Sequence, residues 1–274
     1  RTRLFSGAGW SINYSQSLTP SPKGGFVIVT RPDGRVIQFV KSGTAWVADS
    51  DIVERLVTTT DGGSQSGWLL VSSNDSHEEY SLSGTLLNIR YRDGRVVRLA
   101  YRNVAESSTY PSGRPECNWE EASRSDITRL VCVSDEFRTP MTFGLDASNR
   151  LLAANNFANS EFSFEYDALL AGRVSRLVSV RYPDLTVRRY LYNEPEWVVA
   201  GSPQYALTGI TDENGSRYAT WTYDAQGRAI SSEHAGGADK VTLAYNSSNT
   251  AVTDARGTTR TKNLTTILGV VKST

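Results

Sequence analysis

The side chains that could do chemistry are few and scattered in this sequence of 274 residues. The two histidines, His77 and His234, lie far apart, and neither belongs to a metal-binding pattern such as His-Glu-x-x-His or Cys-x-x-Cys. The sequence has no Gly-x-Ser-x-Gly motif that would expose a serine nucleophile. We therefore expect no metal site, no cofactor and no catalytic residue, and we expect that the protein is not an enzyme.

Two pairs of adjacent acidic residues, Asp135-Glu136 and Asp212-Glu213, could hold a cation or act as the carboxylates of a glycosidase. In a strand, however, neighbouring side chains point to opposite faces of the sheet, so the two carboxylates of a pair would not share a site. We interpret both pairs as solvated turn residues.

The two cysteines, Cys117 and Cys132, allow two interpretations. A disulfide would attach the region around Cys117 to the strand expected over residues 128–133, as is common in exported proteins. Two unpaired buried thiols are the alternative.

A repeated motif organises the chain: a strand ends in Tyr-Asp, a turn closes on Gly-Arg, and a second strand follows. The clearest copies are Tyr223-Asp224 with Gly227-Arg228 and Tyr166-Asp167 with Gly172-Arg173. Two degenerate copies keep only the Asp-Gly-Arg turn, at Asp33, Gly34, Arg35 and at Asp93, Gly94, Arg95. Asp-Gly favours tight hairpins because glycine accepts a positive φ and aspartate bonds its own backbone.

Apolar residues alternate with polar ones beside these turns, as in Val241, Leu243 and Tyr245, and this period of two predicts strands. We expect an all-β fold, an array of antiparallel hairpins over residues 1–274 with an irregular loop inserted at about 103–125. A β-propeller or a β-sandwich is the alternative. Propeller repeats are usually longer and more regular than the spacing here, which is roughly 20 residues.

The chain resembles the Rhs/YD-repeat family, which includes bacterial polymorphic toxins, insecticidal toxin-complex subunits and the animal teneurins. The resemblance rests on the Tyr-Asp and Gly-Arg motifs, on the lead-in over residues 211–215, and on Gly7-Ala-Gly-Trp10 with Tyr14. It covers nearly all of the chain. The copies before residue 160 lack the Tyr-Asp pair, and Pro183-Asp-Leu-Thr stands where a glycine turn would be expected.

The resemblance implies a curled, spiralling sheet that forms part of a hollow β-shell around a C-terminal toxic domain until delivery. The implied partners are the rest of the same polypeptide and its toxin, with a cell-surface glycan or a secretion-machinery protein as further possibilities. The implied location is secreted or at the bacterial cell surface. Neither the family's autoproteolytic core nor its variable tail is recognisable, so we expect a fragment of a longer shell.

The same comparison implies structural roles for the motif residues. Tyr166, Tyr223 and Tyr245 should pack between neighbouring hairpins, and the aspartate should start each turn. Arg173 and Arg228 should reach across the sheet to acidic residues of the next hairpin.

Composition argues against two partner classes. The chain has 29 basic and 29 acidic residues, so no basic face for nucleic acid is expected. No apolar run approaches the roughly 20 residues of a membrane helix. The alternative function is an adhesion or carbohydrate-binding module, which would need a solvent-facing aromatic platform made by Trp10, Trp46, Trp68, Trp197 and Trp221.

Overall fold

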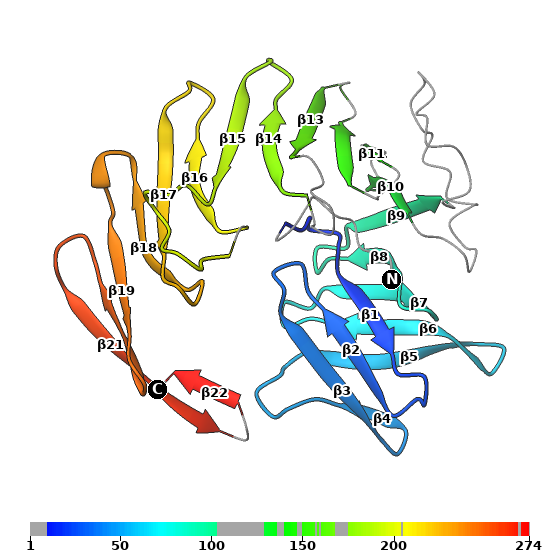
Figure 1. Cartoon of the computed structure of the whole chain (residues 1–274). Helices are drawn as coiled ribbons and strands as arrows, with labels where there is room; N and C mark the ends of the chain where they lie inside the picture. Colours follow the sequence, from blue (N-terminus) through cyan, green and yellow to red (C-terminus); the bar gives the residue numbers. More distant parts are fainter. Residues whose placement is uncertain are drawn as a thin grey trace. The chain divides into compact units, whose positions relative to one another are not determined.

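The computed structural model describes residues 10–102, 129–135, 140–146, 150–156, 158, 160–167, 175–203, 205–267 and 270–273. Within these ranges the chain is built from β-strands, with one short 3-10 turn, η2, at Ala235–Gly237 (Figure 1). The predicted all-β class is confirmed. The chain divides into two compact units, Arg1–Ser163 and Phe164–Thr274.

The first unit contains two sheets. The first, here called the N-terminal sheet, has the order β1-β2-β3-β4 and consists of β1 Ser17–Pro20, β2 Phe26–Thr30, β3 Val36–Ser42 and β4 Ala45–Val47. In the second, each strand pairs antiparallel with the next. Its strands are β5 Arg55–Asp61, β6 Ser64–Val71, β7 His77–Ser81, β8 Leu86–Arg90, β9 Val96–Arg102, β10 Arg129–Ser134, β11 Met141–Leu145, β12 Leu151–Asn155 and the start of β13 Glu161–Tyr166.

Within the second unit, strands that follow one another in the sequence also pair antiparallel. Its strands after β13 are β14 Leu177–Arg181, β15 Val187–Tyr192, β16 Leu207–Thr211, β17 Arg217–Tyr223, β18 Ala229–His234, β19 Val241–Tyr245, β20 Asn249–Thr253, β21 Thr259–Ile267 and β22 Val270–Ser273.

One five-residue turn recurs between these strands. The N–H of its first residue donates to the carbonyl of the fifth, and the N–H of its fourth residue donates to the carbonyl of the first. It is found at Arg31–Arg35, Ser72–Ser76, Ser81–Thr85, Tyr91–Arg95, Tyr182–Thr186, Asp212–Ser216, Asp224–Arg228 and Asp254–Thr258. The turn places its fourth residue at positive φ, so glycine recurs there.

Two of these turns lack the glycine. Asp75 takes φ +59° and Leu185 takes φ +71° at the fourth position. The turn at Pro183-Asp-Leu-Thr, where the sequence lacked the expected glycine, therefore has the same hydrogen bonds as its neighbours. Leucine accepts this conformation at a cost of about 1 to 2 kcal/mol.

The N-terminal sheet lies over β5–β9 as a second layer. Its inward side chains Val27, Val29, Ile37 and Phe39 are almost fully buried. Trp46 meets Trp68 of β6 edge-on, with ring centroids 5.3 Å apart. This two-layer region is a feature that the expectation of one array over residues 1–274 did not include.

In the second unit the described strands are only half-covered. The side chains of β18 and β20 are almost all intermediate in exposure, and the fully buried apolar residues are small or medium-sized: Leu177, Val180, Ala206 and Ala219. The loop predicted at about 103–125 lies outside the described residues.

Candidate functional site

The turn Asp224–Arg228 forms a closed hydrogen-bonded cluster on the predicted motif. Asp224 Oδ1 accepts the backbone N–H groups of Gln226 at 3.0 Å and Arg228 at 2.9 Å. Asp224 Oδ2 accepts the Arg228 guanidinium Nε at 2.7 Å. Desolvation alone would raise the pKa of Asp224, but the hydrogen bonds and charge of Arg228 lower that pKa below the ordinary aspartate value.

Arg228 was expected to reach an acidic residue of the next hairpin, and this expectation is wrong. Its ion pair is with Asp224 of its own turn. The five-residue turn explains the difference, because it brings the first and fifth residues side by side.

The same cluster recurs with Asp167, although its arginine is not the predicted one. Asp167 binds both the backbone N–H and the guanidinium of Arg176, with Oδ2 to Nε at 2.6 Å. Gly172 and Arg173 lie outside the described residues. The sequence signal that could have found Arg176 is its place directly before β14, as Arg228 stands directly before β18.

Asp146 and Arg150 repeat the arrangement. Arg150 donates its backbone N–H to Asp146 Oδ1 at 2.9 Å and its Nε to Oδ2 at 2.6 Å. The motif therefore extends into the first unit without a tyrosine in front of the aspartate, where Leu145 stands.

In each of four hairpins, a tyrosine on the second strand bonds the first strand at the end opposite the turn. Its hydroxyl donates to the carbonyl of the first residue of the preceding strand, which lies 15 or 16 residues earlier. The pairs are Tyr101 with Leu86 at 2.6 Å, Tyr192 with Leu177 at 2.8 Å, Tyr223 with Leu207 at 2.8 Å, and Tyr245 with Ala229 at 2.7 Å. Sequence reasoning named Tyr223 and Tyr245 but missed Tyr101 and Tyr192, which the spacing from strand start to tyrosine could have revealed.

Cation-π contacts connect two of these tyrosines, Tyr192 and Tyr245, to the arginine of the preceding turn. The Arg228 guanidinium lies 4.4 Å from the ring centre of Tyr245, and that of Arg176 lies 4.9 Å from the ring centre of Tyr192. Each arginine thus links one turn to the tyrosine that ends the following hairpin. Tyr166, the other predicted motif tyrosine, ends β13 half-buried.

The degenerate Asp-Gly-Arg copies use their residues differently. Asp33 and Asp93 are the third residues of their turns, and each accepts the backbone N–H of the arginine two residues on, Arg35 at 2.9 Å and Arg95 at 3.0 Å. Their guanidinium groups go elsewhere. Arg35 pairs with the buried Glu54, and Arg95 stacks 4.2 Å from the ring centre of Tyr91.

A buried ionic cluster joins the N-terminal sheet to β7. The Arg31 guanidinium makes two bonds to the Glu78 carboxylate, at 2.6 and 2.9 Å, and the Tyr80 hydroxyl donates to the same carboxylate at 2.6 Å. Glu78 is only 3% exposed and Tyr80 only 2%. Burial and the neighbouring Glu78 charge raise the pKa of Tyr80 well above its ordinary value, so it stays a donor.

In the second unit, Glu194 fixes the connection between β15 and β16. Arg217 binds both of its carboxylate oxygens, at 2.8 and 2.9 Å, and the Thr208 hydroxyl donates to it at 2.6 Å. The hydrogen bond from Arg217 is the main cause that lowers the pKa of Glu194. The same connection reaches the repeat motif, because the Tyr223 N–H donates to the Trp197 carbonyl at 3.1 Å.

The two residues of the acidic pair Asp212-Glu213 bind different groups. Asp212 accepts the Ser216 N–H at 2.9 Å inside its turn, whereas Glu213 pairs with Arg188 of β15 at 2.9 Å. Its two carboxylates therefore engage different partners. In the other pair, Asp135 is described but Glu136 lies outside the described residues.

Cys132 is fully buried in β10 and is disulfide-bonded. The only other cysteine in the sequence, Cys117, lies outside the described residues. The predicted pairing therefore remains a prediction.

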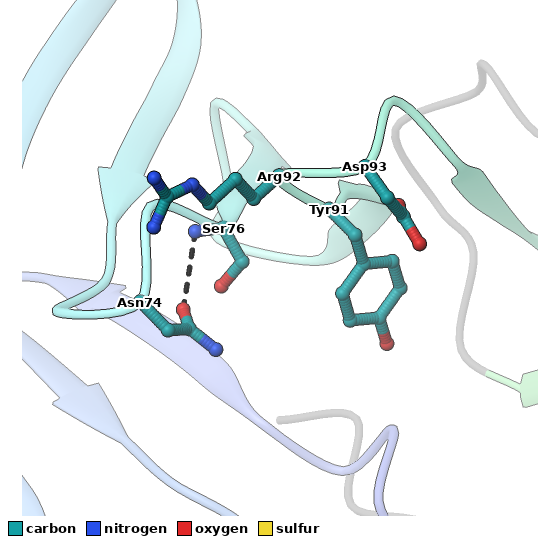
Figure 2. Close-up of a pocket in the computed structure, with 5 residues that line it drawn as sticks. All are labelled: Asn74, Ser76, Tyr91, Arg92 and Asp93. Carbon is teal, nitrogen blue, oxygen red and sulfur yellow. Dashed lines mark hydrogen bonds between the residues drawn. The ribbon is translucent and has the colours of Figure 1, made fainter.

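A shallow concavity of about 400 Å³ lies beside the turns Ser72–Ser76 and Tyr91–Arg95 (Figure 2). Its lining residues are Asn74, Ser76, Tyr91, Arg92 and Asp93, and the Ser76 N–H donates to Asn74 Oδ1 at 3.1 Å. These five side chains include no nucleophile paired with a base. Across the described ranges, no group of three or more His, Cys, Asp or Glu residues could hold a metal ion.

The aromatic platform of the adhesion hypothesis would require exposed tryptophan side chains. Trp68 is buried, and Trp10, Trp46, Trp197 and Trp221 are each only partly exposed. Trp46 and Trp68 pack on each other rather than on solvent. No helix within the described ranges is long and apolar enough to cross a membrane.

No family model matches the chain, and no curated protein matches it. Among solved structures it is similar to a chain of the TcdB2–TccC3–Cdc42 crystal structure, at 12% identity and a TM-score of 0.39 over 90% of this chain and 15% of that one. It is similar to TcdB2–TccC3 without the hypervariable C-terminal region at 12% identity and a TM-score of 0.39, with coverages of 91% and 14%.

The Photorhabdus luminescens Tc holotoxin pore gives 12% identity and a TM-score of 0.38, over 94% of this chain and 15% of that one. Over most of its length the chain is thus distantly similar to components of Tc toxin structures. It spans about 15% of the length of the solved chains that it matches.

Proposed function

We propose that this chain is a structural segment of an Rhs-type secreted toxin. It would form part of the wall of a hollow β-shell that sequesters a C-terminal toxic domain until delivery. Its partners would be the rest of the same polypeptide and the enclosed toxin, and it would act outside the producing bacterium or at its surface. A cell-surface glycan or a secretion-machinery protein would be a further partner.

The observation that carries the proposal is the repeated Asp-Arg turn cluster with the tyrosine that closes the following hairpin. Asp167, Arg176 and Tyr192 form one copy, and Asp224, Arg228 and Tyr245 form the next. A motif that fixes each hairpin to its neighbour builds a long strip, and a strip of right-handedly twisted strands curls. Such a strip is suited to enclosing a cargo.

The role we propose is containment, without catalysis. The polar groups of the repeat motif are engaged within the fold, because its aspartates, arginines and tyrosines bond one another or the backbone. Groups engaged in this way position strands rather than a substrate.

Limited proteolysis of the natural polypeptide that carries this segment tests the proposal. The sequence that follows the segment should resist protease until the shell is denatured, and should then be digested rapidly. Ready digestion of that sequence under native conditions would contradict the proposal. A glycan-binding screen would then be the next experiment, since an adhesion module is the alternative.

A further inference from the structure

The outer face of the N-terminal sheet carries no charged side chain. The inward residues Val27, Val29, Ile37 and Phe39 are buried against β5–β9, and the residues between them point outward. The outward positions are polar but uncharged or are apolar, and the apolar ones include Phe26, Ile28, Val36, Val40 and Val47. The outer face is therefore uncharged, with apolar residues next to polar ones such as Thr30 and Gln38.

The strand register places three of these residues in one continuous row. Phe26 of β2 lies opposite Val40 of β3, and Val40 lies opposite Val47 of β4. They are 42%, 48% and 52% exposed, and Val36 at the other end of β3 is 59% exposed. Scattered exposed apolar residues are ordinary, whereas a continuous exposed row indicates an interaction surface.

The outward face of β5–β9 in the same unit is different. It carries Arg55, Glu79, Arg90 and Arg98 at outward positions. Val57 is 49% exposed there, but it lies next to Arg55 on the strand and among these charges. That face is suited to water, and it would bury unpaired charges if an apolar surface covered it.

We infer that the outer face of the N-terminal sheet binds the same face of a second copy of this chain. An uncharged sheet face requires an uncharged partner surface, because charges buried on it would have no partner. The face meets this requirement toward itself, and a two-fold axis would bring the two rows of Phe26, Val40 and Val47 together. The two sheets would pack face to face, as the layers of a β-sandwich do.

The size of the face sets the strength of this association. Four strands of about five residues cover about 17 by 19 Å. This is less than the roughly 800 Å² per partner of a standard stable interface, so the dimer is weak and forms only at high protein concentration. The inference does not depend on the proposed shell function.

Sedimentation velocity of the whole chain tests the inference over an about hundred-fold range of concentration. The wild-type protein should shift from monomer toward dimer as concentration rises. Val40→Lys should weaken the dimer at least about ten-fold, because the lysine charge would lie in the centre of the interface. Val57→Lys is the matched control, since Val57 is equally exposed but lies outside the face, and it should leave the association unchanged.

Cysteine cross-linking gives a second readout, because a disulfide traps even a sparsely populated dimer. Gln38→Cys places a thiol in the middle of the face and should form a dimer disulfide quickly under mild oxidation. Arg98→Cys, exposed on the outward face of β9, should not. A wild-type protein that stays monomeric throughout overturns the inference. It is also overturned if Val57→Lys weakens association as much as Val40→Lys, or if Arg98→Cys cross-links as fast as Gln38→Cys.

Discussion

The two units keep their sheets folded in different ways. In the first unit, a second sheet covers β5–β9 and buries large side chains such as Phe39, Leu70 and Tyr80. In the second unit, the described strands lie half-exposed, and side chains tie the hairpins to one another through turn clusters and tyrosine hydroxyls.

This difference indicates where each unit derives its stability. Burial of apolar surface contributes about 25 cal/mol for each Å² removed from water, so the covered unit relies on its sheet-to-sheet contact. A half-covered sheet has less of this contribution, and each hydrogen bond that fixes a hairpin end adds about 1 kcal/mol. Mutations of buried groups should therefore cost most in the first unit, whereas the loss of a single, more exposed polar contact in the second unit should cost about 1 kcal/mol or less.

The largest effect should come from Gly84→Ala. A Cβ on Gly84, which has φ +89°, would lie 1.7 Å from the Leu18 carbonyl oxygen of the N-terminal sheet. Overpacking and left-handed strain together should cost about 3 to 5 kcal/mol of unfolding free energy, measured by chemical denaturation. Gly34→Ala is the control, because Gly34 has φ +86° with nothing within 4 Å of the added Cβ. If both variants lose the same unfolding free energy, the loss at Gly84 comes from its positive φ and not from its close approach to Leu18.

Removal of Arg31 should produce the next largest loss. Arg31→Met leaves the Glu78 carboxylate buried without its counter-ion, which should cost about 3 kcal/mol. Hydrogen exchange followed by mass spectrometry should show the loss in β1–β9. Arg228→Met, which breaks the more exposed pair with Asp224, should cost under about 1 kcal/mol. Comparable losses from both variants would contradict the contrast between the units.

Tyr223 tests the contribution of the hydroxyl ties in the second unit. Tyr223→Ala should cost on the order of 3 kcal/mol, because ring packing and the hydrogen bond are both lost. Tyr223→Phe keeps the ring and should cost about 1 kcal/mol, since the Leu207 carbonyl loses its donor. Thermal unfolding separates the two contributions. An unchanged melting temperature for Tyr223→Ala would show that this tyrosine does not hold the hairpins together.

One substitution should stabilise the second unit. Leu185→Gly relieves the positive φ of +71° at the fourth position of its turn, where the leucine side chain is 71% exposed and makes little packing contact. We expect a gain of up to about 1 kcal/mol, the left-handed strain less the added freedom of the unfolded chain. Gly215→Ala, at the same position of the next turn along the chain, should lose a similar amount. A destabilised Leu185→Gly would show that the turn does not strain leucine.

The smallest effect should be a pH dependence in the second unit. The folded-state pKa of Glu194 is lower than its ordinary value of 4.5, chiefly because Arg217 bonds it. Its stabilising contribution is therefore complete above pH 4.5 and is lost as the pH falls through the lower folded-state pKa. Glu194→Gln should reduce the acid-dependent part of the melting temperature. The same acid dependence in wild type and variant would assign it to other carboxylates.

Much of the fold could be predicted from the sequence because its signals are local. Asp-Gly and Asp-x-x-Gly patterns specify the turn through glycine's positive φ and the aspartate side chain, and alternation specifies the strands. The site was predicted only in part. Arg176 was missed because it lies nine positions after Asp167, whereas in the clear copy Arg228 lies four positions after Asp224.

The partner of Arg228 was mispredicted for a related reason. Sequence spacing shows which residues recur but not which way a long guanidinium side chain turns. The turn geometry selected Asp224, because its Oδ atoms stand next to both the N–H and the Nε of Arg228.

The sequence by itself determined the all-β class, the turns that carry Asp-Gly, and the motif tyrosines Tyr223 and Tyr245, because these signals depend on residues close together along the chain. Only the tertiary structure decided that β1–β4 form a separate layer over β5–β9, and that Arg31 meets Glu78 across 47 residues. A strand's alternation shows that one face is buried, but not what buries it. That choice depends on contacts between distant residues, which no local pattern encodes.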